Sequence, residues 1–470
     1  MEAPTDTSPL VEYLSAAQAA ALLGRQVEAL GATEFARVRN LEYVFAPFEL
    51  YPLAPRTPLP LERIAAFAVD MDGTSTTTEP VALHALEYMV RRVTGWLDRA
   101  RWPGLDRQRD YPFVIGSSNY RHTEFLLERY GTHVDQAALR QAFFEAVLWT
   151  LANVPDPRRR QEVQRSARNC GLSALLADPE FQRLCERGRV DLDDVARQAA
   201  PWAARFRDAF SCGHRRELVN AALDIYYLRY HALLQKIERG EGDRLAAERL
   251  RTGGRHLVEP MPGYAVFVAL IKGWLGEDAD GVFDRLRGAV PTDEGLDEAL
   301  GRFRRLALHF QKCPARLALV TASIAYEARA VMREVLRRMV REIQDWPISA
   351  MKKEMMQGRC AEEHHVFEAL VTASDAHEAR LKPHRDLYSI ALFQMAVPRS
   401  AYSCCVGLED TEPGVVALRA AGFGGAIALP NRDTRAQNYA AASRVVHGGL
   451  PELMLRHNLF LSDPVLADYG

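Results

Sequence analysis

The pattern of hydrophobic and polar positions divides the chain into regions of different kinds. Residues 64–69, IAAFAV, form a short apolar run with charged residues on either side, which is typical of a strand covered on both faces of a parallel sheet. From about residue 79 to 255, long amphipathic segments replace this pattern, with hardly any alternating strand signal. We therefore predict a helical block, with helices at 81–101, 120–130, 136–152 and 214–239.

After residue 260, strand and helix signals alternate again. This βαβ rhythm is typical of an α/β protein with a doubly wound parallel sheet. The helical block is then an insertion between the first strand of the sheet and the others. The predicted strands are 316–320, 366–371, 403–406 and 425–429, and the predicted helices are 324–345, 386–396 and 413–421.

The N-terminal region differs from the helical block and from the α/β region. Residues 15–39 carry Ala, Leu and Val at helical spacing after a possible Ser15 cap, and prolines then punctuate an extended segment up to Pro60. We expect three parts in the chain. They are an N-terminal helical extension with a Pro-rich linker (1–60), an α/β core (61–78 and 258–470) and an inserted all-α cap domain (79–257).

The composition narrows the class of protein. The 470 residues are 48% hydrophobic and 26% charged, as in ordinary globular proteins, which excludes disordered, collagenous and coiled-coil classes. Lys and Arg total 59 against 61 Asp and Glu, so the chain has no net basic field to hold a nucleic acid or an anionic membrane. We therefore expect no nucleic acid and no membrane as a partner.

Cysteine usage and the apolar runs predict the cellular location. The seven cysteines contain no CxxC pair, which argues against a disulfide framework or a zinc site. The N-terminal stretch lacks the basic and apolar regions of a secretory signal. The longest apolar run, Tyr264–Ile271, is far shorter than the ~20 residues that span a bilayer. We expect a cytoplasmic protein, and the sequence does not predict its oligomeric state.

Polar residues follow the predicted strands at one edge of the sheet. In open parallel sheets, ligands bind at the carboxyl ends of the strands. The first strand is followed by Asp70-Met-Asp72-Gly-Thr, the second by Thr321-Ala322-Ser323, the third by a loop to Lys382, and the fourth by Gly-Leu-Glu409-Asp410-Thr. Carboxylates, hydroxyls and one lysine are thus predicted to converge.

This combination of groups predicts phosphoryl transfer. Clustered carboxylates with too little counter-charge repel one another and favour a bound cation, and an oxygen-only ligand set suits Mg²⁺. Lys382 and Thr321 can then hold the remaining phosphate oxygens. One aspartate is left to attack phosphorus as a nucleophile.

Four segments resemble the motifs of the haloacid dehalogenase superfamily, in their expected order. They are DMDGT at 70–74, VTAS at 320–323, the lysine in RLKPHRDLYSIAL at 380–392, and VGLEDTEPGVVALRAAGF at 406–423. The resemblance covers about 61–80 and 258–455. The helical block resembles the family's C1 cap in its position after the first motif, but it is much larger than the usual four- or five-helix bundle.

The resemblance implies a role for each motif residue. Asp70 is the nucleophile that becomes phosphoaspartate, and Asp72 is the general acid and base. Thr321 and the backbone N–H of Ala322 bind the phosphoryl oxygens, and Lys382 bridges phosphate and nucleophile. Mg²⁺ is held by Asp70, Glu409, Asp410 and the backbone carbonyl of Asp72.

The second aspartate also narrows the activity that the resemblance implies. Relatives that dehalogenate lack an aspartate at the position of Asp72, and ion-pumping ATPases have threonine there. We therefore expect a Mg²⁺-dependent phosphohydrolase that acts on a small phosphorylated metabolite through an aspartyl-phosphate. The alternatives are a phosphomutase of the same superfamily and a non-catalytic binding protein that senses phosphate esters. The sequence does not identify the metabolite.

In the helical block, the segment 114–122 is the best candidate for substrate contacts, because a polar patch follows an apolar run where a helix starts. Ser117, Ser118, Asn119, Arg121 and His122 are its candidate residues, although an N-cap turn also explains Ser118 or Asn119 without a ligand. A second group is interpreted as helix packing. It consists of Tyr226, Tyr227, Tyr230 and His231.

The first motif departs from the family pattern in two places. The stretch after Asp72 reads GTSTTTEP, with Ser75 where leucine is usual and Thr77 where aspartate is usual. These residues lie where the chain enters the helical block, so the connection to the cap is expected to differ from that of relatives.

Overall fold

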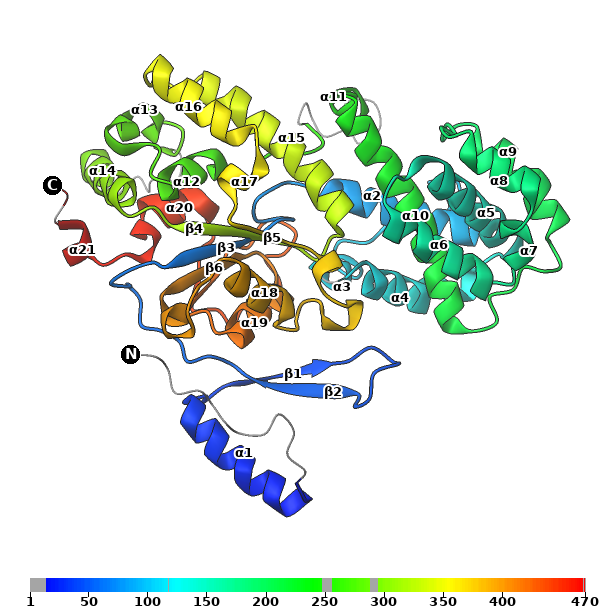
Figure 1. Ribbon diagram of the computed structural model, residues 1–470, viewed down its shortest axis with the longest axis horizontal. Coiled ribbons are helices and arrows are strands. Elements are labelled where there is room, and N and C mark those ends of the chain that lie inside the picture. Colours follow the sequence, from blue (N-terminus) through cyan, green and yellow to red (C-terminus); the bar gives the residue numbers. More distant parts are fainter. Residues whose placement is uncertain (1–13, 117, 247–255, 288–294, 468, 470) are drawn as a thin grey trace.

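The structure, a computed structural model, describes residues 14–116, 118–246, 256–287, 295–467 and 469. A central sheet carries helices on both faces, a helical lobe lies at one end, and an N-terminal arm lies beneath the sheet (Figure 1). None of the helices in these residues is both long enough and apolar enough to cross a membrane.

The sheet has six parallel strands in the order β5-β4-β3-β6-β7-β8. The strand β3 lies between β4 and β6, so the winding reverses direction there, and a crevice opens at the carboxyl ends of strands at such a switch point. The predicted doubly wound parallel sheet is confirmed. The strands are β3 (Ala66–Asp70), β4 (Arg316–Val320), β5 (Ala369–Val371), β6 (Cys405–Glu409), β7 (Gly425–Ala428) and β8 (Arg444–Val445).

Successive residues of β3 face opposite layers, as the pleat of a strand requires. Phe67 packs against Phe267 and Phe310 with ring centroids 5.4 and 6.4 Å apart, whereas Ala66 and Ala68 belong to the core on the other face. Every residue of β3 is buried, which explains its continuous apolar run.

Helices of the core cover the two faces of the sheet. The helices α18 (Asp386–Gln394) and α19 (Glu412–Ala421) lie on one face, and α15 (Ala325–Gln344) and its neighbours lie on the other (Figure 1). The remaining core helices are α12 (Tyr264–Ile271), α13 (Asp280–Phe283), α14 (Leu296–Lys312), α16 (Ala350–Cys360), α17 (Glu363–Val366), α20 (Gly449–Leu455) and α21 (Asp463–Ala467).

Two predicted strands are displaced in the structure. The predicted strand 366–371 begins at Ala369, because residues 363–366 form α17. The predicted strand 403–406 becomes 405–409, because residues 399–404 form a 3₁₀ helix. A short buried helix and a buried strand have the same apolar composition, so the sequence pattern does not separate them. As a result, Glu409 ends the strand instead of following it.

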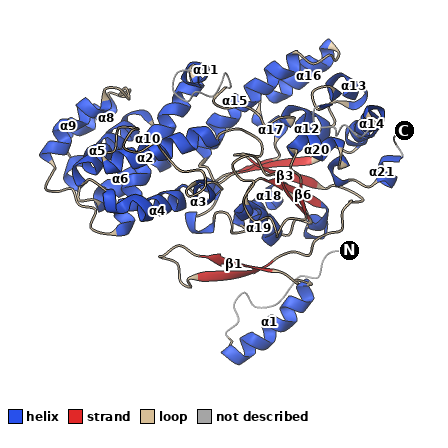
Figure 2. Cartoon of the chain, turned by 180° about the vertical axis from the view of Figure 1, so that it is seen from behind, coloured by secondary structure: helices blue, strands red, loops and turns tan. Residues whose placement is uncertain are grey.

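The helical lobe corresponds to the predicted cap, residues 79–257, and is called the cap below. Its described part has only helices as regular elements. Its longest helix, α10, contacts α2, α4, α5 and α6 (Figure 2). The predicted helix 81–101 ends at Thr94, where Gly95 takes a φ of 68°. The helices are α2 (Glu79–Thr94), α3 (Tyr111–Val114), α4 (Asn119–Tyr130), α5 (Gln136–Asn153), α6 (Pro157–Asn169), α7 (Ser173–Leu176), α8 (Pro179–Glu186), α9 (Val195–Arg205), α10 (Arg215–Glu238) and α11 (Gly242–Leu245).

The two connections between core and cap are hydrogen bonded to each other. Thr77 donates its backbone N–H to the carbonyl oxygen of Glu259 (3.0 Å), and Met261 donates to that of Ser75 (2.9 Å). Glu259 in turn donates its backbone N–H to the hydroxyl of Thr77 (3.2 Å). Residues 75–77 and 259–261 therefore form a two-stranded ribbon, which we call the hinge ribbon.

The N-terminal arm corrects the prediction of a helix over 15–39. The helix α1 (Ala16–Leu30) begins at Ser15, which forms a capping box with Gln18, and ends at Gly31 with a φ of 61°. The strands β1 (Phe35–Arg39) and β2 (Phe48–Pro52) then form an antiparallel hairpin, so the expected linker is partly folded. The glycine and the alternation of Phe-Ala-Arg-Val-Arg favour a strand over a longer helix.

The hairpin of the arm braces the loop that carries Lys382. Glu49 in β2 pairs with Arg380 (2.8 Å), which also pairs with Asp386 (2.9 Å). The hydroxyl of Tyr51 lies 2.7 Å from Nδ1 of His384. These contacts fix the chain on both sides of Lys382.

Candidate active site

Lys382 joins two carboxylates at the carboxyl edge of the sheet. Its Nζ forms an ion pair with Asp70, the last residue of β3, and lies 2.6 Å from Oε1 of Glu409. Tyr388 donates its hydroxyl to the same Glu409 oxygen (2.5 Å). Burial lowers the pKa of Lys382, but the two facing carboxylates more than offset this effect and raise its pKa above the usual value. The lysine therefore remains a cation.

Asp410 completes a cluster of three buried carboxylates. Oxygens of Asp70, Glu409 and Asp410 lie within 4.8 Å of one another. Asp410 accepts hydrogen bonds from the hydroxyl of Thr74 (3.2 Å) and the side-chain amide of Asn431 (2.8 Å), which orient it toward the other two. The sequence that follows β6 therefore places both acids of the fourth motif beside the first.

The electrostatics of this cluster favour a cation. Burial, followed by repulsion from Glu409, raises the pKa of Asp70 well above its usual value. Burial and the nearby carboxyl groups of Glu79 and Glu409 also raise the pKa of Asp410 well above its usual value. One ammonium group is too little charge for three carboxylates, and a hard divalent cation relieves this repulsion. The donor set of carboxylate oxygens fits Mg²⁺.

Gly73 makes room for this arrangement. Its φ is 82°, and a Cβ atom there would lie 2.3 Å from Oδ2 of Asp410. The glycine of the first motif is thus required both by its backbone conformation and by the close approach of the acid.

Asp72 occupies a different environment from Asp70, although only one residue separates them. Its carboxylate accepts hydrogen bonds from the hydroxyls of Thr78, Thr321 (3.1 Å) and Ser323 (3.3 Å). Burial raises the pKa of Asp72 even though these hydroxyls and Lys382 lower it. The Asp72 side chain does not join the carboxylate cluster. The two aspartates of the first motif therefore differ in their partners, Asp70 facing an ammonium and carboxylates and Asp72 facing hydroxyls.

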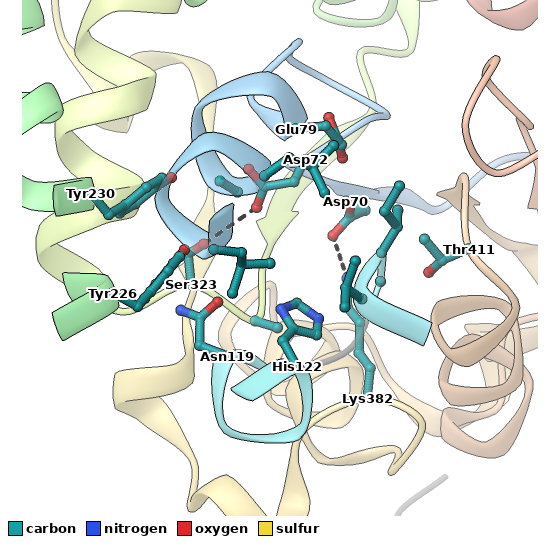
Figure 3. A pocket seen from close by; sticks show the side chains of 17 residues that line it. Asp70, Asp72, Glu79, Asn119, His122, Tyr226, Tyr230, Ser323, Lys382 and Thr411 are labelled. Carbon is teal, nitrogen blue, oxygen red and sulfur yellow. Dashed lines mark hydrogen bonds and ion pairs between the residues drawn. The ribbon is translucent and has the colours of Figure 1, made fainter. Parts of the chain in front are cut away.

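A small cavity separates this edge of the sheet from the cap. Its volume is about 80 Å³, which holds on the order of five or six water molecules. Its core side is formed by Asp70, Asp72, Ala322, Ser323, Lys382 and Thr411. The cap side includes Glu79, Leu83, Leu86, Val114, Ile115, Asn119, His122, Tyr226 and Tyr230 (Figure 3).

The structure brings some of the predicted cap residues to the cavity and not others. Asn119 and His122 line it. Ser118 is the N-cap of α4 and accepts the backbone N–H of Arg121 (3.4 Å). The guanidinium of Arg121 donates to the carbonyl of Arg39 (2.7 Å), outside the cavity. Ser117 lies outside the described residues.

Two residues of the site, Glu79 and Asn431, were not singled out from the sequence, although Glu79 follows the first motif closely. Tyr226 and Tyr230, one helical turn apart, were singled out but interpreted as helix packing. The tyrosine rings do stack, with centroids 5.5 Å apart, as the packing interpretation predicts, but both residues also line the cavity. Asn431 follows β7 without any sequence signal.

Comparison with known proteins gives structural similarity only. No protein-family model and no curated protein matches the chain. Similar solved structures are HAD-family phosphatases and phosphomutases. CbbY from Rhodobacter sphaeroides, solved with phosphate, is 15% identical, with 83% of this chain and 96% of CbbY covered and a TM-score of 0.37.

Two further structures show the same level of similarity. A phosphoglycolate phosphatase from Lactobacillus delbrueckii, so named provisionally, is 14% identical over 84% of this chain and 99% of its own, with a TM-score of 0.38. The β-phosphoglucomutase of Clostridium difficile is 13% identical over 86% and 98%, with a TM-score of 0.31. Identities and scores are low, so the function proposed below depends on the chain's own residues.

Proposed function

We propose that the protein is a Mg²⁺-dependent phosphohydrolase of the haloacid dehalogenase type, which acts on a small phosphorylated metabolite through an aspartyl-phosphate. One observation carries the proposal. Two aspartates of one motif face the same cavity in different environments, Asp70 against Lys382 and the acidic cluster, and Asp72 against three hydroxyls. This division suits a nucleophile and a separate acid.

The first half of the reaction transfers the phosphoryl group to the protein. An oxygen of Asp70 attacks phosphorus while the bond from phosphorus to the leaving oxygen breaks. Asp72, in its protonated form, donates its proton to that leaving oxygen. Lys382 and the loop at Thr321 and Ala322 hold the phosphoryl oxygens. Mg²⁺ bound by Asp70, Glu409 and Asp410 would neutralise charge on the phosphoryl group.

The second half releases phosphate. Asp72, now a carboxylate, accepts a proton from a water molecule that attacks the phosphorus of the aspartyl-phosphate. The bond between phosphorus and the Asp70 oxygen breaks, so Asp70 is regenerated and inorganic phosphate leaves. Closure of the cap over the cavity keeps bulk water from competing at the first step.

A panel of phosphorylated metabolites, assayed for phosphate release with Mg²⁺ and with a chelator, tests the proposal. Asp70→Asn should reduce turnover by at least about a thousandfold while the fold is retained. The matched control is Asp284→Asn, whose carboxylate is 84% exposed. Mass spectrometry of the acid-quenched protein should show a phosphorylated peptide containing Asp70.

The outcomes separate the candidate functions. Substantial activity in Asp70→Asn would remove the nucleophile from the proposal. Phosphate release that requires a bisphosphate activator would indicate a phosphomutase. Thermal stabilisation by phosphate esters, without turnover of any of them, would indicate a binding protein.

A further inference from the structure

Two tyrosine hydroxyls point into the cavity from the cap. Tyr226 and Tyr230 project from α10, and each is only 2% exposed. Figure 3 shows both hydroxyl groups directed toward the space between Asp72 and Ser323. Within the described part of the chain, neither hydroxyl forms a hydrogen bond with another residue. Both residues line the cavity, so both hydroxyls are placed to contact a ligand or its water.

Glu79 adds a carboxylate to the same side of the cavity. It is the first residue of α2, and its side chain lies beside Asp72 in the cavity lining (Figure 3). No hydrogen bond from another described residue reaches its carboxylate. Glu79 is therefore available to a donor on the leaving group of a substrate.

The cap side of the cavity offers no ammonium or guanidinium group among its described lining residues. Lys382 is the single Lys or Arg in the described lining, and it already contacts Asp70 and Glu409. Asn119 contributes an amide, and His122 contributes an imidazole, which can donate or accept. A second phosphate or a carboxylate on the leaving group would thus be buried without an ammonium or guanidinium partner, which is unfavourable.

We infer that the cap selects phosphate monoesters whose leaving alcohol carries a hydroxyl or ammonium group and no second anionic group. The inference rests on the proposed phosphohydrolase function and names the substrate class of that site. The cavity volume of about 80 Å³ favours a small leaving alcohol. Hydroxyl and ammonium groups share the ability to donate to Glu79 and the tyrosine oxygens.

Three esters of matched size test the inference with the Mg²⁺-loaded protein. They are 2-aminoethyl, 2-hydroxyethyl and carboxymethyl phosphate, which end in an ammonium, a hydroxyl and a carboxylate. We expect kcat/KM for at least one of the first two to exceed that for carboxymethyl phosphate by roughly tenfold or more. The ratio of kcat/KM for 2-aminoethyl phosphate to that for 2-hydroxyethyl phosphate shows whether the site prefers an ammonium or a hydroxyl donor. Equal or better use of carboxymethyl phosphate would overturn the inference.

Variants locate the selectivity. Glu79→Gln should shrink the preference against carboxymethyl phosphate about tenfold, whereas Glu87→Gln, on the same helix but outside the cavity lining, should not. Tyr226→Phe and Tyr230→Phe should each raise KM for the preferred ester about fivefold. Tyr130→Phe, a cap tyrosine outside the lining, is their control. An unchanged KM in both phenylalanine variants would contradict the assigned contacts.

Acetyl phosphate separates failure of this inference from failure of the proposed function. Hydrolysis of acetyl phosphate without any preference among the three esters would overturn the inference alone. If neither acetyl phosphate nor any ester releases phosphate, the proposed function fails. The charge preference is then still measured by thermal stabilisation of Asp70→Asn with each ester, where stabilisation by carboxymethyl phosphate equal to that by the other two would overturn it.

Discussion

At the scale of single residues, the site separates two carboxylates that are close in the chain. Asp70 is neutralised by Lys382 and belongs to the acidic cluster, whereas Asp72 depends on hydroxyl donors. Burial raises the pKa of both carboxyls; neighbouring carboxylates raise that of Asp70 further while Lys382 opposes them, whereas hydroxyl donors and Lys382 lower that of Asp72. The proposed roles therefore rest on the different partners of the two carboxylates.

Asp72→Asn tests this assignment. Loss of the acid should slow hydrolysis of alkyl phosphate esters by about 10²–10⁴-fold, because an alkoxide leaves poorly without a proton. Acetyl phosphate has a good leaving group, so the variant should still form the aspartyl-phosphate and then stall. Rapid-quench kinetics should show a burst of acetate near one equivalent per protein. An equal loss of rate for the first step with both kinds of substrate would contradict the role.

Asp410→Asn tests the metal site. In the wild-type protein, Mg²⁺ at about 100 times its dissociation constant should add about 2.7 kcal/mol to the free energy of unfolding. The variant should lose most of this gain, and without Mg²⁺ it should be at least as stable as wild type, because one of three repelling charges is gone. Urea unfolding with and without Mg²⁺ measures both effects. A full Mg²⁺ response in the variant would exclude Asp410 as a ligand.

The same cluster predicts a pH dependence. The pKa of Asp70 and of Asp410 is raised by burial and by like charges. A raised carboxyl pKa gives stability that is present at low pH and is lost as pH rises through the folded-state value. The stabilisation by Mg²⁺ should therefore be larger at neutral pH than at pH 5.

At the scale of elements, the start of α19 shapes the acidic cluster. Thr411 is its N-cap and also donates its hydroxyl to Glu409 (3.1 Å). A Cβ atom on Gly414, in the first turn, would lie 1.9 Å from Cδ of Glu409. The helix can approach the strand end this closely only because that residue is a glycine.

Gly414→Ala should therefore displace the Glu409 carboxylate. We expect the Mg²⁺ concentration for half-maximal activity to rise about tenfold or more, since a ligand is moved while the helix itself is favoured by alanine. Gly358→Ala in α16 is the control, because a Cβ atom there would meet nothing within 4 Å. Unchanged Mg²⁺ activation in Gly414→Ala would show that Glu409 does not hold the metal.

The sequence predicts elements and motif residues with different success, for physical reasons. Asp70, Thr321, Lys382 and Asp410 could be placed together because parallel strands all end at one edge of the sheet. The shift of β6 was not predictable, since the apolar run around Cys405 suits a short helix as well as a strand.

The cap residues show where sequence patterns stop being informative. Tyr226 and Tyr230 share one face of α10, but only the packing of α10 against α2 and the core shows that this face borders the cavity. Arg121 is the opposite case. Its position in the segment 114–122 predicted a substrate contact, but its guanidinium binds the backbone carbonyl of Arg39 in the hairpin.

At the scale of the whole molecule, cap and core share a buried acid–imidazole pair. His231 on α10 lies 2.9 Å from Glu327 on α15, and both side chains are fully buried. Burial raises the pKa of Glu327 to about 8 and lowers the pKa of His231 to about 3. Both groups are therefore uncharged at neutral pH, and the contact is a hydrogen bond between neutral partners.

This pair predicts how stability changes with pH. The raised pKa of Glu327 gives stability that is lost as pH rises toward 8, and the lowered pKa of His231 gives stability that is lost as pH falls toward 3. The two effects cancel between the unfolded-state values, so stability falls above pH ~6.5, by on the order of 2 kcal/mol at pH 8. Urea unfolding at pH 6.5 and 8 measures the loss.

Glu327→Gln should remove most of this loss, because glutamine keeps a hydrogen bond to His231 and cannot ionise. Glu354→Gln, at an exposed position of α16, is the matched control and should behave as the wild type does. A variant that loses as much stability as the wild type between the two pH values would show that other groups cause the change.

The hinge ribbon bears on how the lobe can swing. Its two strands, residues 75–77 and 259–261, are hydrogen bonded to each other. The lobe is therefore connected to the core by one two-stranded ribbon and not by two independent segments. At the core end of the hinge ribbon, the hydroxyl of Ser75 donates a hydrogen bond to the backbone carbonyl oxygen of Asp70 (2.6 Å). Bending of the hinge ribbon would therefore move the backbone of Asp70, so a movement of the lobe would change the position of the proposed nucleophile.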